Sequence, residues 1–124
     1  MNRTPALRVK RIYDPATTAD GYRILVDRLW PRGVARKKAN IEEWLKDIAP
    51  STELRDWFAH RPERWQEFVT RYRAELATPA READLRHLRE QAKTGVVTLL
   101  YAAKDEARNN AVVLRDLLLD SPVT

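Results

Sequence analysis

The sequence predicts an α/β fold, with a small mixed sheet of three or more strands flanked by about five helices. Two observations support this prediction. Strand-like segments occur at residues 7–13, 22–30 and 96–101, and four helical segments separate the second strand from the third. The third segment, Val96–Tyr101, is an apolar run that follows Gly95, which is typical of a strand buried on both faces.

The first two strands are predicted from alternation and from the turn residues around them. Leu7–Tyr13 alternates loosely, and Asp14-Pro15 ends it because proline has no N–H to donate to a neighbouring strand. Tyr22–Trp30 follows the turn signal Asp20-Gly21. Residues 16–21 are too few for a crossover helix, so we expect the first two strands to pair antiparallel.

Apolar residues at helical spacing predict the helices. Because the long helical connection is typical of a parallel crossover, we expect the second and third strands to be parallel, with their carboxyl ends at one edge. The predicted helices are Ile41–Ile48 capped by Asn40, Thr52–Ala59 capped by Ser51, a helix from Pro62 to about Ala77, Pro79–Lys93 and Asn109–Leu119.

The length and composition limit the class of protein. A chain of 124 residues suits one domain, which we expect to span residues 1–124 with its core at about 7–119. The absence of cysteine excludes disulfides, thiolate nucleophiles and cysteine zinc sites. No apolar run approaches the roughly 20 residues that span a membrane, and the first residues lack an apolar signal segment. We therefore expect a cytoplasmic protein without a membrane partner.

Positive charge is concentrated at the start of the chain. The net charge is +5, and residues 1–40 hold ten Lys/Arg against three Asp/Glu, whereas residues 41–124 hold thirteen against fifteen. This distribution suggests an anionic partner, either a small phosphate- or carboxylate-bearing ligand or a nucleic acid. A solvated basic surface without a dedicated ligand is the alternative.

Charged and polar side chains follow the second and third strands, at the edge where parallel α/β sheets bind ligands. Arginine forks, a lysine and the free N–H groups at a helix start suit a phosphate or carboxylate. The predicted ligand-binding residues are Arg28, Trp30, Arg32, Lys104, Asn109 and Asn110, with Asp27 and Asp105 as the candidate catalytic acid and base.

Each of these residue types also has a structural interpretation. Arg28 can form an ion pair with Asp27, Asp47 or Asp105 instead of holding a ligand. The two candidate carboxylates can pair with arginine or cap a helix. Trp30 is the tryptophan best placed to stack on a ligand, because the other three fall on apolar helical stripes and are expected in the core.

Known catalytic motifs are missing from the sequence. It contains no P-loop, no G-x-S-x-G and no H-E-x-x-H, and its three glycines cannot form a dinucleotide-binding loop. The residues therefore identify no reaction, cofactor, metal site or oligomeric state. Three functions remain open: an anion-binding domain with or without catalysis, a nucleic-acid-binding protein, and a partner-binding module without a ligand.

Several long segments resemble one family. The segments VKRIYDP (9–15), DGYRILVDRLWPRG (20–33), WLKDIAPSTELRDWFAH (44–60) and TLLYAAKDEARNNAVVL (98–114) are similar to the YeaO-like family, domain of unknown function 488. The resemblance implies a small cytoplasmic α/β protein without an assigned activity. The family pattern has a histidine where this chain has Asn110, and an amide cannot titrate in its place. A more distant branch has a Cys-His-Arg motif, whose thiol chemistry this cysteine-free chain cannot perform.

Overall fold

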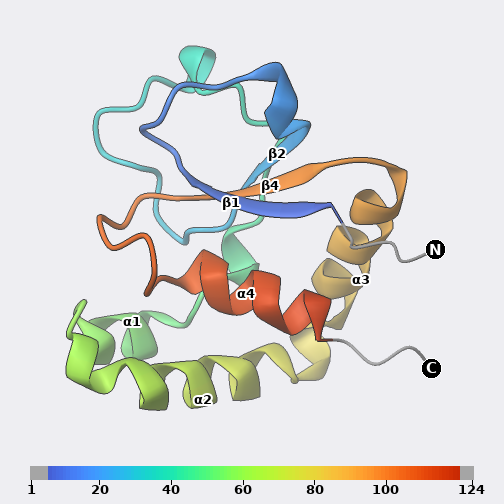
Figure 1. Cartoon of the computed structure of the whole chain (residues 1–124). Coiled ribbons are helices and arrows are strands. Elements are labelled where there is room, and N and C mark those ends of the chain that lie inside the picture. Colours follow the sequence, from blue (N-terminus) through green and yellow to red (C-terminus); the bar gives the residue numbers. More distant parts are fainter. Residues whose placement is uncertain (1–5, 121–124) are drawn as a thin grey trace.

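The centre of the molecule is a four-stranded sheet with the strand order β1-β4-β2-β3 (Figure 1). The computed structural model describes residues 6–120. All three strand pairings are parallel, so the predicted α/β class is confirmed but the sheet is not mixed and has one more short strand. The strands are β1 Leu7–Arg11, β2 Tyr22–Leu25, β3 Glu43–Trp44 and β4 Val97–Tyr101.

The predicted antiparallel pairing of the first two strands is wrong, because β4 lies between β1 and β2 and pairs in parallel with both. The connection at residues 12–21 crosses β4 with a single 3-10 turn, η1 (Thr18–Asp20). The Thr98 hydroxyl of β4 donates to the Asp20 carbonyl at 2.7 Å and ties the turn to the strand. A short turn is thus enough to cross one strand. The predicted parallel arrangement of β2 and β4 is confirmed.

Ile41–Ile48 was predicted to be a helix, and this prediction is wrong. The segment contains the edge strand β3 and a 3-10 turn, η3 (Lys46–Ile48). Its backbone bonds to β2, as in the hydrogen bond from the Leu45 N–H to the Leu25 carbonyl at 2.9 Å. Pairing with the sheet therefore outweighs the helical spacing of its apolar residues. Asn40, the predicted cap, has a left-handed φ of 52° instead.

The other predicted helices are present within a few residues of their expected bounds. Ser51 caps the first by accepting the Leu54 N–H at 3.1 Å, and Asn109 caps the last by accepting the Val112 N–H at 3.0 Å. The described residues thus form four α-helices and not five. They are α1 Thr52–Phe58, α2 Trp65–Leu76 after the 3-10 turn η4 (Pro62–Arg64), α3 Pro79–Thr94 and α4 Asn110–Leu119.

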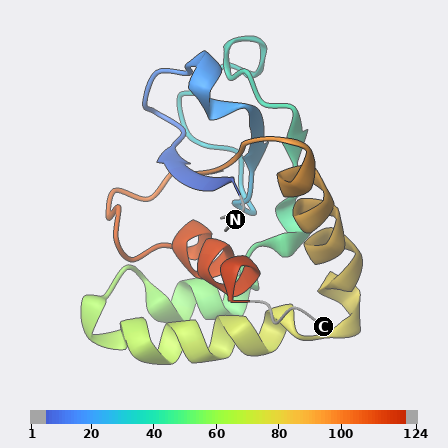
Figure 2. The ribbon, with the colours of Figure 1, turned by 45° about the vertical axis from the view of Figure 1, so that its right-hand side comes forward.

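The helices cover one face of the sheet (Figures 1 and 2). In both views α4 lies directly against β1 and β4, α1 and α2 form the next layer, and α3 runs along one side. Ile24 and Leu99 point into this main core, where they meet Phe68 and Tyr72 from α2. Loops cover the opposite face, including the segment with the 3-10 turn η2 (Arg36–Lys38). Within residues 6–120, no helix has the length and apolar character to cross a membrane.

Candidate functional site

A cavity of about 270 Å³ opens at the carboxyl ends of β2 and β4. The loop after β2, the segment from Ala49 to His60, α2 and the loop between β4 and α4 all contribute to its lining. Its walls include Leu29, Pro31, Pro50, Phe58 and Phe68, and its polar groups come from Asp27, Arg28, Arg55, His60, Asn109 and Asn110.

Asp27 brings a partly buried carboxylate to this cavity, two residues beyond the end of β2. One carboxylate oxygen accepts the Ala102 N–H at 2.9 Å, and the Trp44 indole donates to the Asp27 carbonyl at 2.7 Å. Burial raises the pKa of Asp27, and the hydrogen bond from Ala102 and the amide of Asn110 offset only part of this rise. The Asp27 carboxylate forms no ion pair with any residue that the structure describes.

Arg28 lines the cavity but is also bound to the backbone. Its Nε donates to the Pro50 carbonyl at 3.1 Å, and its Nη2 donates to the Ala49 carbonyl at 3.2 Å. Its Nη1 lies 3.7 Å from Asp47, so the structural ion pair considered from the sequence is formed with Asp47. The arginine therefore holds the segment before α1 in place, and its Nη1 has only the exposed Asp47 carboxylate as a partner among the described residues.

The two asparagines at the start of α4 have different roles. Asn109 is buried, and it caps the helix while its Nδ2 donates to the Asp105 carbonyl at 2.9 Å. Both ends of that side-chain amide are therefore occupied. Asn110 donates its Nδ2 to the Val26 carbonyl at 2.9 Å, and its side-chain oxygen accepts no hydrogen bond from the described residues.

Asp105 closes the turn that leads into α4. It accepts the N–H groups of Ala107 and Arg108 at 2.9 and 3.0 Å, and these hydrogen bonds hold the pKa of Asp105 below its usual value. It does not line the cavity, and neither do the exposed residues Arg32 and Lys104. The structure therefore does not bring these three predicted site residues to the cavity with Asp27.

Trp30 lines the cavity but is packed against its own neighbours. Its indole N–H donates to the Val34 carbonyl at 2.7 Å. Its ring meets the Trp44 ring edge-on at 5.4 Å between centroids, and the Arg36 guanidinium lies 4.5 Å from its centroid. The predicted stacking face is thus occupied in part by a cation from this chain.

Sequence reasoning missed Arg55, His60, Phe58 and Phe68. The rings of the two phenylalanines stack at 4.4 Å between centroids beside the cavity. Ala59 and His60, directly after α1, have left-handed φ values of 46° and 56°. This sharp turn after α1 presents His60 to the cavity, and no sequence signal marks a left-handed pair without glycine.

Comparisons with known proteins identify the class. The family model described as "Inactive DUF488-N3 subclade" matches residues 6–122. The chain therefore belongs to the DUF488 family, as its resemblance predicted. No solved structure matches it.

Two relatives illustrate this membership. The chain is 47% identical over 112 residues to "Uncharacterized protein YeaO" of Escherichia coli K12. The aligned region covers 90% of this chain and 96% of the relative. It is 44% identical over 118 residues to "Uncharacterized protein Rv3073c" of Mycobacterium tuberculosis H37Rv, and this aligned region covers 95% of this chain and 98% of the relative.

Proposed function

We propose that this protein binds a small molecule with an apolar body and a carboxylate or phosphate group in the cavity at the carboxyl end of the sheet. The main support is the composition of the lining. Arg28, Arg55 and His60 provide cationic or N–H donor groups, whereas Asp27 is the single carboxylate among the described residues of the lining. The phenylalanine and proline walls suit the apolar body of such a ligand.

The proposed anion is held mainly by Arg55. Its guanidinium is exposed, and its partner Asp56 is an exposed neighbour at 3.8 Å, so this surface ion pair is weak and can be exchanged for a ligand. His60 follows the same helix and lines the same cavity. Arg28 adds its Nη1, because the backbone holds its Nε and Nη2, and the long contact of Nη1 with the exposed Asp47 is a weak ion pair that a ligand can replace.

Binding without catalysis fits the residues better than an enzyme does. The second candidate acid or base, Asp105, closes a turn outside the cavity, and Asn110 cannot transfer protons at neutral pH. The matching subclade is described as inactive, and this description supports the same proposal.

The test uses benzoate and phenyl phosphate as probes in an NMR titration of the whole protein. Shifts should map to the cavity, and Arg55→Ala should weaken binding by about tenfold or more, because it removes a charged hydrogen-bond donor. Arg86→Ala is the matched control, since Arg86 pairs with Glu82 at 3.0 Å on the exposed surface of α3. Equal affinity in wild type and Arg55→Ala would contradict the proposal.

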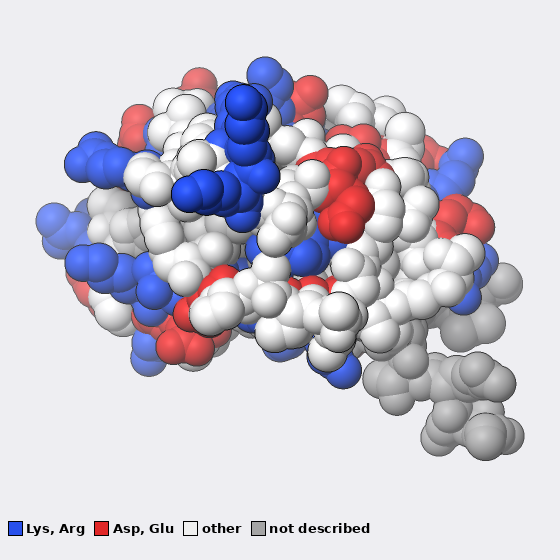
Figure 3. Space-filling view, turned by 90° about the horizontal axis from the view of Figure 1, so that it is seen from above, with Lys and Arg blue, Asp and Glu red and all other residues white. Residues whose placement is uncertain are grey.

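Nucleic-acid binding through the first third of the chain stays a prediction. Several of its basic groups have partners within the protein, as with Lys10 on Asp20 and Arg11 on the Ala103 carbonyl. On the face shown in Figure 3, blue side chains form separate groups with acidic and uncharged residues between them. A steep loss of RNA or DNA affinity with salt would support this alternative.

A further inference from the structure

The half-buried residues of the cavity lining present side-chain oxygens that can accept further hydrogen bonds. Asp27 receives the backbone N–H of Ala102 and the side-chain amide of Asn110, and its carboxylate forms no ion pair with a described residue, although Arg55 and His60 line the same cavity. Asn110 uses its Nδ2 on the Val26 carbonyl, so the free end of its amide is an oxygen. Both oxygens belong to residues that line the cavity.

Such acceptors favour a particular kind of partner. Neither Asp27 nor Asn110 has a fully buried side-chain oxygen without a hydrogen-bond partner, so water or a neutral donor can also satisfy these oxygens. A donor that also has positive charge stabilises an ionised carboxylate more strongly than a neutral donor does. A ligand with an amino or amidino group provides both, because its N–H groups donate and its charge is opposite to that of Asp27.

The exposed side of the lining has the opposite character. Arg55 and His60 are both exposed and donate N–H groups, whereas Asp27 and Asn110 are half-buried and accept. A ligand that satisfies both sides must be polar at two ends, with a donor at one end and an anion at the other. The phenylalanine walls lie beside the same space and suit a flat body between the ends.

We propose that the ligand has an amino or amidino group that donates to Asp27 and to the Asn110 side-chain oxygen, at the opposite end from its carboxylate or phosphate. This inference rests on the proposed function, because it specifies the second end of the ligand that the cavity binds. The class is therefore a zwitterion or an amino-substituted heterocycle with an acidic group, and a simple organic acid is a weaker ligand.

The test compares matched probes that differ only at the donor end. In the first series, 4-(aminomethyl)benzoate is compared with 4-ethylbenzoate, which has the same size and carboxylate but no ammonium. In the second series, adenosine monophosphate is compared with purine riboside monophosphate, in which a hydrogen atom replaces the amino group. Dissociation constants come from NMR titration of the whole protein, and the carboxyl carbon of Asp27 is followed by its ¹³C shift.

We expect the amino-bearing probe of at least one series to bind at least about tenfold more tightly than its partner, as a charge-assisted hydrogen bond predicts. Its binding should also shift the titration midpoint of the Asp27 carboxyl to lower pH, because a nearby cation favours the ionised form. The series that shows the preference tells whether the donor is an aliphatic ammonium or a heterocyclic amine.

Two variants assign the preference to Asp27. Asp27→Asn keeps an acceptor for the Ala102 N–H but removes the charge, so the preference should fall to near unity while 4-ethylbenzoate still binds. Asp120→Asn is the matched control, because Asp120 is an exposed aspartate that contacts Arg73 at 3.3 Å, outside the lining. A preference that persists in Asp27→Asn would overturn the assignment.

The remaining outcomes separate the two proposals. If the probes with and without the amino group bind equally in both series, the inference fails and the proposed anion site stands. If none of the four probes shifts the resonances of the cavity residues, the proposed function fails, and the inference fails with it.

Discussion

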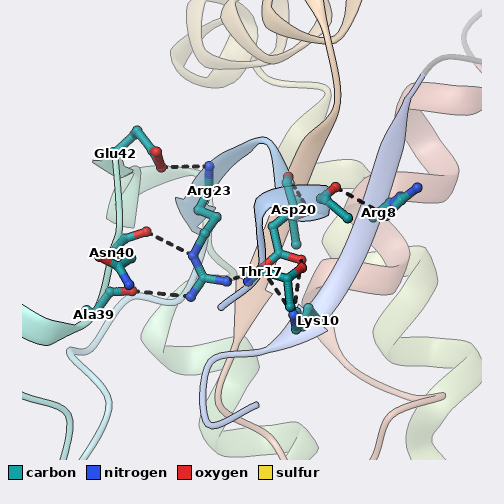
Figure 4. A network of polar contacts seen from close by, with 10 residues as sticks. Arg8, Lys10, Thr17, Asp20, Arg23, Ala39, Asn40 and Glu42 are labelled. Carbon is teal, nitrogen blue, oxygen red and sulfur yellow. Dashed lines mark hydrogen bonds and ion pairs between the residues drawn. The ribbon is translucent and has the colours of Figure 1, made fainter. Parts of the chain in front are cut away.

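Two aspartates flank β2 and have opposite environments. Asp20 lies two residues before the strand and is 4% exposed, and Figure 4 shows it between Lys10 and Arg23. The Lys10 Nζ lies 3.0 Å from one carboxylate oxygen, and Arg23 and Thr17 also bond to Asp20. Asp27 lies two residues after the strand, and it has a backbone N–H and a side-chain amide beside it but forms no ion pair with a described residue; Arg55 and His60, which line the same cavity, lower its pKa only in part.

The pKa values of the two groups move in opposite directions. Burial by itself raises the pKa of Asp20, but the Thr17 N–H and then Lys10 and Arg23 outweigh it and bring the pKa to about 2. Burial of Asp27 is not offset in this way, so its pKa rises. One carboxylate is satisfied by the protein itself and stabilises the loop-covered face of the sheet. The other has no ion-pair partner among the described residues and is the group that we propose binds a ligand, and the following four changes test this contrast.

Asp20→Ala should have the largest effect on stability. It leaves Arg23, which is 4% exposed, without its carboxylate, although the Asn40 and Ala39 carbonyls still accept from this arginine. Removing one partner of a buried ion pair costs about 3–5 kcal/mol, and urea unfolding should show a loss in this range. Asp47→Ala, which removes an exposed ion pair, should change the unfolding free energy by less than about 1 kcal/mol. Similar losses in both variants would contradict the contrast.

Gly21→Ala should cause the next largest loss of stability. Gly21 joins η1 to β2 at the same end of the sheet as Asp20. Its φ is +63°, and an added Cβ would overlap the Val96 carbonyl oxygen. A side chain in this conformation and space should destabilise the protein by about 2 kcal/mol or more in urea unfolding. Gly95→Ala is the control, since an added Cβ there meets nothing within 4 Å. A tolerated alanine at position 21 would show that this connection can move.

Protonation of Asp20 at low pH should lower the free energy of unfolding by less than the Asp20→Ala substitution does. The pKa of Asp20 falls from 3.8 to about 2 on folding, which corresponds to about 2 kcal/mol of stability. Because the folded pKa is the lower one, this contribution is complete above about pH 4 and is lost as the pH falls towards 2. Unfolding free energies measured from pH 2 to 7 should show this slope in wild type and a smaller one in Asp20→Asn. An unchanged slope would mean that Asp20 is not the group responsible.

Asp27→Asn should have the smallest effect on stability, and in the stabilising direction. The folded pKa of Asp27 is raised, so its ionisation destabilises the folded protein progressively as the pH rises above the ordinary aspartate value. Asparagine keeps an oxygen for the Ala102 N–H and has no charge to bury. The melting temperature of the variant should therefore rise relative to wild type between pH 4 and pH 7. A clear drop at neutral pH would indicate that the Asp27 charge has a structural partner.

Several helices and strands were predicted correctly from local sequence patterns, because the residues that stabilise them lie close together along the chain. Ser51 and Asn109 cap helices through their own side chains, and the spacing of Phe68, Tyr72 and Leu76 creates the buried stripe of α2. The apolar run of β4 predicted a strand buried on both faces, and all five of its residues are buried. The parallel arrangement of β2 and β4 was also predicted, and it placed the expected site at the edge of the sheet where the cavity lies.

Residues close together along the chain were thus enough to predict most helices and strands, the family, and the charged residues after β2. Contacts between distant segments place β4 between β1 and β2, pair residues 43–44 as an edge strand, and bring Arg55 and His60 to the cavity that Asp27 also lines. The two kinds of feature differ in the sequence separation of the residues that cause them. Capping and periodicity depend on neighbours along the chain, whereas strand order and the environment of a carboxylate depend on segments that are distant in sequence, such as Asp20 and Thr98.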